Sequence, residues 1–133
     1  MLLQFFPELS LALTLLTGKY EAFSGLLITC IVSAVLKEIG KQYLGSFCLR
    51  PRDAKDCTLW RKGRCGHEPG LPSTHSSVAG YLYANLVFRK ECLAGLLVVV
   101  PVSRVVRNCH TVFQTVIGVL LGIVIFICQT ALS

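Results

Sequence analysis

Two short stretches of this sequence carry the residue types that chemistry on a phosphate ester requires. They are residues 70–76 and residues 103–114, and each contains one histidine. A serine, a threonine, an arginine and a glutamine accompany the two histidines. The residues concerned are Ser73, Thr74, His75, Arg104, His110 and Gln114.

The first stretch stands at an expected helix start, with Pro72 just before it and Ser73 as the expected N-cap. A helix N-terminus presents free backbone N–H groups and a partial positive charge, which together favour an anion. The arginine in the second stretch adds a fork of donors that matches phosphate oxygens. Two histidines can then divide the work of nucleophile and acid near neutral pH.

Composition indicates a membrane protein. The chain has 133 residues, enough for a single domain over residues 1–133. It is 53% hydrophobic and only 15% charged, which is too apolar for an ordinary soluble domain. The net charge is +6, but the basic residues lie between apolar stretches and not along one helix face. We therefore expect membrane lipids and an anionic substrate as partners, and no nucleic acid.

The seven cysteines bear on the cellular compartment. Seven is odd, so at least one thiol stays unpaired within the chain. Cys57 and Cys65 lie in one polar stretch and could pair if that stretch faces an oxidising compartment. Together with His67 they also suggest zinc, but a fourth ligand and the usual C-x-x-C spacing are missing. We expect no metal.

Five apolar segments predict five helices, joined around one polar loop at residues 48–73. The first segment has no basic residue before Lys19, so it lacks the charged start of a cleaved signal peptide. We expect it to remain in the mature protein. The predicted helices cover about residues 2–17, 20–47, 73–89, 91–106 and 110–133.

Helices that cross a bilayer in alternation bring every second connection to the same face. The end of the second helix, the start of the third, the end of the fourth and the start of the fifth therefore meet. This arrangement gathers Arg50, Ser73, His75, Arg104 and His110. We predict an all-α, polytopic transmembrane bundle of about five helices with its active site at one membrane face.

Two signals disagree about which face that is. An excess of basic residues on the loop side favours the cytoplasm. A Cys57–Cys65 bridge would instead favour an oxidising lumen. We favour the lumenal face, with the endoplasmic reticulum or another endomembrane as the location.

These motifs resemble the type 2 phosphatidic acid phosphatase superfamily of integral membrane lipid phosphatases. The pattern of that family is Lys-(six)-Arg-Pro, then Pro-Ser-Gly/Ser-His, then Ser-Arg-(five)-His-(three)-Asp. Arg50 and Pro51 match the end of the first motif, and residues 72–75 match the second. Residues 103–110 match the third motif, and the resemblance covers about residues 37–122.

The chain departs from the family pattern at two positions. Tyr43 stands where the first motif has its lysine; Lys41 is the nearest lysine and Lys37 lies further away. Gln114 stands where the third motif has its aspartate. The dolichyl-diphosphatase branch has a similar His-Thr-x-x-Gln stretch and a similar Pro-Ser-Ser-His-Ser segment. That branch is therefore the nearest resemblance.

The resemblance implies a mechanism without metal or cofactor. His110 attacks phosphorus and forms a phosphohistidine, while Gln114 orients its ring. His75 protonates the leaving oxygen and later activates water. The remaining contacts to phosphate are assigned to Arg50, Arg104, Lys41, Ser73 and the backbone N–H groups of Thr74 and His75.

Two alternatives concern the function, and several concern the substrate. The first is a catalytically inactive membrane protein of the same fold that binds lipid phosphates or acts as a scaffold. The second is a soluble vanadate-dependent haloperoxidase, which the uncharged final segment disfavours. Within the phosphatase reading, dolichyl or polyprenyl diphosphate is the first choice of substrate, and phosphatidic acid, phosphatidylglycerol phosphate or a sphingoid phosphate stay open. A homodimer that covers the exposed flank of so small a bundle also stays open.

Overall fold

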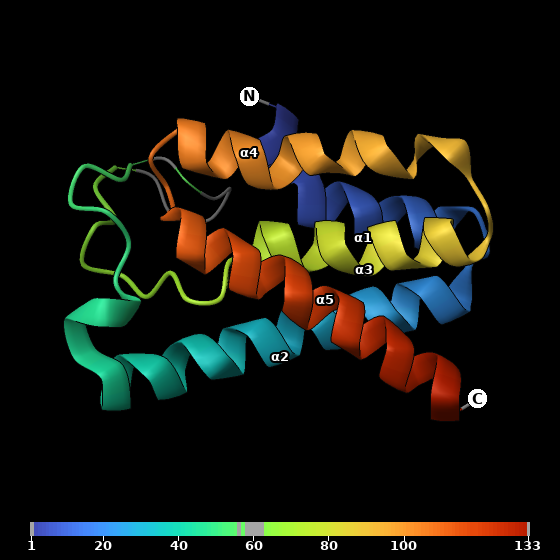
Figure 1. The fold of residues 1–133 in the computed structure, drawn as a ribbon, viewed down its shortest axis with the longest axis horizontal. Helices are drawn as coiled ribbons and strands as arrows, with labels where there is room; N and C mark the ends of the chain where they lie inside the picture. The colour runs from blue at the N-terminus through green and yellow to red at the C-terminus, as the bar shows by residue number, and fades with distance from the viewer. Residues whose placement is uncertain (1, 56, 58–62, 133) are drawn as a thin grey trace.

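Five α-helices and three 3-10 turns make up most of the chain in the computed structural model (Figure 1). The structure describes residues 2–55, 57 and 63–132, and within them there is no β-strand, only two isolated bridges. The all-α prediction is confirmed. The helices are α1 (Phe6–Leu16), α2 (Tyr20–Leu44), α3 (Thr74–Phe88), α4 (Val99–Val106) and α5 (Val112–Leu132); the turns are η1 (Leu2–Phe5), η2 (Gly45–Cys48) and η3 (Cys92–Val98).

The predicted boundaries differ from the observed ones mainly at the fourth and fifth helices. The segment from Cys92 starts as the 3-10 turn η3 and becomes α-helical only at Val99. The fifth helix begins at Val112, so His110 lies in the turn before it. The α4–α5 turn reverses the chain at Asn108, whose φ of 60° is left-handed, a conformation that asparagine tolerates better than most residues.

Helix α3 is central and packs most closely on α5 (Figure 1). Gly118 and Gly122 of α5 lie against the first turns of α3 and have no room for a side chain. A Cβ at Gly118 would come within 2.6 Å of the carbonyl oxygen of Ser73, and one at Gly122 would overlap the carbonyl oxygen of Ser77. This small-xxx-small spacing lets the two backbones approach closely. It fixes the start of α3 beside the start of α5.

Two helices, α2 and α5, are long and apolar enough to cross a membrane. The helices at Phe6–Leu16 and Cys92–Val106 are apolar but shorter. The outward face of α5 is built from exposed aliphatic side chains. They include Val116, Leu120, Val124 and Ile127.

The polar loop and the α4–α5 turn lie at the same end of the bundle, and the α1–α2 and α3–η3 connections lie at the other (Figure 1). Backbone hydrogen bonds join the parts of the loop end. Arg50 N donates to Glu68 O at 3.0 Å, and Ser73 N donates to Gln114 O at 3.3 Å. The structure therefore brings the end of α2, the start of α3, the end of α4 and the start of α5 together.

Candidate active site

Thr111 and Gln114 form a capping box at the N-terminus of α5, and Gln114 also contacts the catalytic candidate His110. Thr111 Oγ1 accepts from Gln114 N at 3.2 Å, and Gln114 Oε1 accepts from Thr111 N at 3.1 Å. These reciprocal bonds satisfy two backbone donors that a helix start otherwise leaves free. Gln114 Nε2 also donates to Leu49 O at 2.8 Å. Gln114 thus ties α5 to the polar loop.

The His110 ring is held through its Nδ1 atom. That nitrogen lies 2.9 Å from Gly70 O and 3.3 Å from Gln114 Oε1. Both oxygens can only accept, so Nδ1 carries the proton and Nε2 keeps a free lone pair. A Cβ at Gly70 would lie 2.8–3.2 Å from Arg50, Gln114 and His110, so only glycine fits there. The predicted contact between Gln114 and His110 is present.

Burial and nearby positive charge both keep this ring neutral. Burial lowers the pKa of His110 well below its ordinary value of 6.5, and the charges of Arg50, Lys37 and Arg104 lower it further. Arg50 Nη1 lies 3.3 Å from His110 Nε2 and can donate to it only when that nitrogen is unprotonated. The site therefore presents a neutral imidazole.

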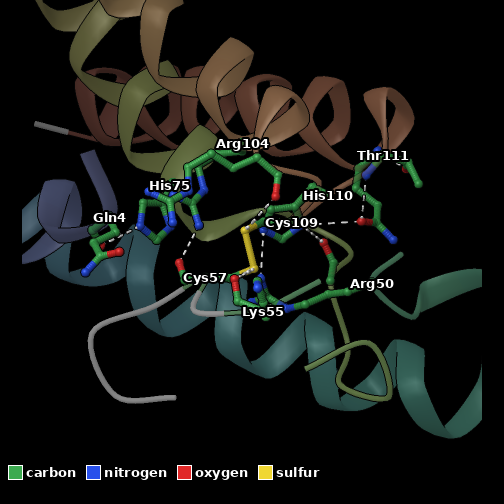
Figure 2. Close-up of a disulfide and its surroundings, with 12 residues drawn as sticks. Gln4, Arg50, Lys55, Cys57, His75, Arg104, Cys109, His110 and Thr111 are labelled. Carbon is green, nitrogen blue, oxygen red and sulfur yellow. Dashed lines mark hydrogen bonds between the residues drawn. A yellow bond between two sulfur atoms is a disulfide. The ribbon is translucent and has the colours of Figure 1, made fainter. Parts of the chain in front are cut away.

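Two buried guanidinium groups with unused donors lie among the side chains around the two histidines, and Figure 2 shows that of Arg104 on the side of His75. Arg104 is fully buried, and its Nη2 donates to the carbonyl oxygen of Cys57. Within the described part of the chain, Arg104 Nε, Arg104 Nη1 and Arg50 Nε have no hydrogen-bond partner. A buried donor without a partner costs about 1–3 kcal/mol, more when it is charged. An anion with several oxygens would remove that cost.

A disulfide joins the polar loop to the turn that carries His110 (Figure 2). It links Cys57 to Cys109, whose Cα atoms are 5.6 Å apart. The pairing of Cys57 with Cys65, which the sequence left open, is therefore not present; Cys65 is a buried free thiol in the same apolar cluster. Because Cys57 is in the disulfide, it cannot be a zinc ligand beside Cys65 and His67. No group of three potential metal ligands occurs among the described residues.

The start of α3 forms the other wall of the site. Ser73 is the N-cap, as predicted, and its side chain accepts from Ser76 N at 3.3 Å. His75 is buried, and its Nε2 lies 2.8 Å from the backbone oxygen of Gln4 in η1. Since that carbonyl can only accept, His75 carries its proton on Nε2 in this state. Nothing in the sequence marked Gln4 as a partner of His75.

The lysine at this wall is Lys37 and not Lys41. Lys37 Nζ donates to Thr74 Oγ1 at 2.6 Å. Lys41 lies one turn later on α2 and is exposed. The structure therefore brings His75, Thr74 and Lys37 together and leaves Lys41, the lysine expected from the sequence, on the outer surface.

The PAP2 superfamily model matches residues 22–132 of this chain. The chain belongs to that superfamily, whose members generally act as phosphatases, a class of hydrolases. No curated protein and no solved structure matches the chain. The dolichyl-diphosphatase branch therefore has no relative to support it.

Proposed function

We propose that this protein is a single-domain, multi-pass membrane phosphatase that hydrolyses a lipid phosphate or diphosphate through a phosphohistidine. The observation that carries the proposal is the neutral His110 ring, whose unprotonated Nε2 accepts from Arg50 Nη1 near guanidinium donors that have no partner among the described residues. A nucleophile with a lone pair and a cationic cradle for phosphate oxygens are the two parts that such a reaction needs.

The first half-reaction forms the phosphoenzyme. Arg50 leaves Nε2 and, with Arg104, binds the phosphoryl oxygens. The Nε2 lone pair of His110 attacks phosphorus, the P–N bond forms, and the P–O bond to the leaving group breaks. With the phosphate anion bound beside it, His75 is the imidazolium; it gives its Nε2 proton to the leaving oxygen and keeps the proton on Nδ1. Gln114 Oε1 and the Gly70 carbonyl keep the Nδ1 proton in place as positive charge develops on the ring.

The second half-reaction returns the enzyme to its starting state. His75, now a neutral imidazole with a lone pair on Nε2, takes a proton from water as the water oxygen attacks phosphorus. The P–N bond breaks and its electron pair returns to His110 Nε2. In this scheme the guanidinium groups supply the charge that a divalent cation supplies in other phosphatases, so the reaction needs no metal.

An apolar groove beside the site favours a lipid substrate. It has a volume of about 470 Å³ and runs between α4 and α5. Val106 and Val112 line it, and these residues lie at the end of α4 and the start of α5, the end of the bundle that carries Arg104 and His110. A hydrocarbon tail in the groove would leave its phosphate next to the cationic pocket. Dolichyl or polyprenyl diphosphate is the preferred substrate class, and this preference rests on the His-Thr-x-x-Gln resemblance alone.

The Cys57–Cys109 disulfide supports an orientation with the active site toward an oxidising compartment. For an endomembrane protein that compartment is the lumen of the endoplasmic reticulum or a connected organelle. The basic residues of the loop are then a weaker signal for the cytoplasmic face, because Arg50 is assigned to the phosphate site.

The decisive experiment measures phosphate release by the purified protein in detergent across a panel of lipid phosphates and diphosphates, with and without EDTA. We expect activity that resists EDTA, and an acid-labile, alkali-stable phosphoenzyme. His110→Ala should abolish both. Substantial EDTA-resistant turnover by His110→Ala would defeat the assignment. A wild-type protein that binds these lipids but releases no phosphate would instead support the non-catalytic alternative.

A further inference from the structure

One hydrogen bond joins the second motif to α2, the helix on which the first-motif lysine is displaced. The family position for the first-motif lysine holds Tyr43, and the third residue of the second motif, glycine or serine in the pattern, is Thr74. In the structure, Lys37 donates to that threonine. We propose that Thr74 and Ser33 position the Lys37 ammonium as the third cation of the phosphate site. This inference rests on the proposed phosphatase function.

The phase of α2 explains why the lysine is displaced. The α2 residues that face α3 and the loop are Ser33, Lys37 and Gly40, which follow the three-to-four-residue repeat of a helix face. Tyr43 lies on another face and is 79% exposed. A lysine at the family spacing would therefore point away from the site. Lys37 has the right phase, but it comes earlier on the helix.

The hydroxyl of Thr74 gives the displaced lysine a fixed anchor. Lys37 Nζ lies 2.6 Å from Thr74 Oγ1, and Ser33 Oγ lies 2.8 Å from the same atom. An ammonium can only donate, so Thr74 must accept from Lys37 and share one further hydrogen with Ser33. Ser33 is fully buried, one turn before Lys37. The β-branched Thr74 side chain has restricted χ1 freedom, so the acceptor is held in place.

The ammonium keeps further donors for a ligand. Of its three N–H groups, the bond to Thr74 uses one. Thr74 lies between the N-cap Ser73 and His75, so the ammonium stands at the same helix start that we assign to phosphate. The charge of Lys37 also reaches the nucleophile, because it is among the causes that lower the pKa of His110. These observations place Lys37 at the start of α3, close enough for its charge to act on His110.

The test uses Thr74→Val, which removes the hydroxyl at nearly constant volume, and Thr74→Ser, which keeps it. Lys37→Met removes the ammonium, and Lys41→Met is the matched control one turn away. Affinity for orthovanadate, a phosphate mimic, is measured in detergent by ligand-induced thermal stabilisation, beside KM and kcat for the preferred lipid. Unliganded melting temperatures check that each variant folds.

We expect Lys37→Met to weaken orthovanadate binding and raise KM by about tenfold or more, as for a lost charge-assisted hydrogen bond. Thr74→Val should give a similar change with a smaller effect on kcat, and Ser33→Ala a smaller change in the same direction. Thr74→Ser and Lys41→Met should stay within about threefold of wild type. Combining Thr74→Val with Lys37→Met should add little, because both remove one unit of the site.

A wild-type affinity in Thr74→Val, or a loss in Lys41→Met equal to that in Lys37→Met, would overturn the positioning role. The two proposals fail separately. If wild type binds orthovanadate with this variant pattern but releases no lipid phosphate, the positioning role stands and the phosphatase activity does not. If wild type does not bind orthovanadate at all, both fall.

Discussion

The two histidines of the site are held in opposite ways. The His110 ring is fixed at Nδ1 by two acceptors, and its neighbours are fixed by a disulfide and a capping box. Among the residues that the structure describes, the His75 ring makes one hydrogen bond, in which Nε2–H donates to the backbone carbonyl of Gln4. Figure 2 shows both rings, with Arg104 and Arg50 among the side chains around them.

This difference suits the two roles that we propose. A nucleophile gains from a ring that cannot turn, because its lone pair must stay aimed at phosphorus. An acid must exchange its hydrogen-bond partner for the leaving oxygen, so a single replaceable acceptor is suitable. Substrate binding must displace the Gln4 carbonyl from His75 Nε2 before the proton can move to the leaving group.

The largest effect that tests this contrast is expected from His75→Asn. Hydrolysis of a lipid phosphate, whose leaving group needs a proton, should fall by about 10²–10⁴-fold. A substrate with a phenolate leaving group should still phosphorylate His110. The phosphoenzyme should then accumulate, because its hydrolysis lacks the base. Rapid quench with radiolabelled substrate measures this.

The matched control is His110→Asn, which should form no phosphoenzyme from either substrate. If His75→Asn lost activity equally on both substrates and formed no phosphoenzyme, the separation of roles between the two histidines would be wrong.

A second prediction concerns the disulfide on the His110 side. Cys57 and Cys109 are 52 residues apart, and closing such a loop stabilises the folded state by about 4 kcal/mol in the chain-entropy account. Cys109→Ser should lower the melting temperature and abolish most of the turnover. Without the disulfide, neither Cys57, whose carbonyl accepts from Arg104, nor the turn before His110 is held in place. The exposed Cys128 supplies the control, as Cys128→Ser should leave both unchanged.

Reduction by dithiothreitol should reproduce the Cys109→Ser effect in the wild-type protein and add nothing in the variant. Full activity and an unchanged melting temperature after reduction would show that the nucleophile does not depend on the disulfide for its position.

The structural features around the two histidines differ in how well the sequence predicts them. The helices, the Ser73 N-cap and the meeting of four helix ends follow from local patterns and from chain direction, and the sequence predicted them. The capping box is also local, because Thr-x-x-Gln before an apolar run is its signature. The motif resemblance by itself predicts for Gln114 only the contact with His110.

The other features depend on how distant segments pack. Cysteine pairing cannot be deduced from spacing alone, so Cys109 was not predicted as the partner of Cys57. The number of residues before Arg50 made Lys41 the nearest candidate for the motif lysine. Lys37 is the lysine on the side of α2 that contacts α3, and this depends on how the two helices pack. The Gln4–His75 contact joins a side chain to a backbone carbonyl far away in the sequence, and a backbone carbonyl carries no signal in residue type.

A third prediction separates the acceptor role of the Gln114 side chain from its donor role. Gln114→Leu removes the capping acceptor, one acceptor of the His110 Nδ1 proton and the donor to Leu49. We expect a loss of about 1–2 kcal/mol of stability and roughly a tenfold drop in kcat. Gln114→Glu keeps both acceptor roles and should retain more activity than Gln114→Leu, although it cannot donate to Leu49. Thermal unfolding and steady-state kinetics of both variants measure this, and equal kcat values would remove Gln114 from the orientation of His110.

The smallest expected effect is electrostatic. The folded-state pKa of His110 lies below the unfolded value of 6.5, so folding favours the neutral ring. The stability from this term is fully present above pH 6.5 and is lost as pH falls toward the folded pKa. Burial is the larger cause and Arg50 the next, so Arg50→Gln should raise the pKa of His110 without bringing it to 6.5. Titration of ¹⁵N-histidine resonances in detergent measures both, with His67→Gln and His75→Asn spectra for assignment. A His110 that titrates at or above 6.5 in the free protein would mean that its Nε2 is protonated near neutral pH, and the attacking lone pair would then be missing.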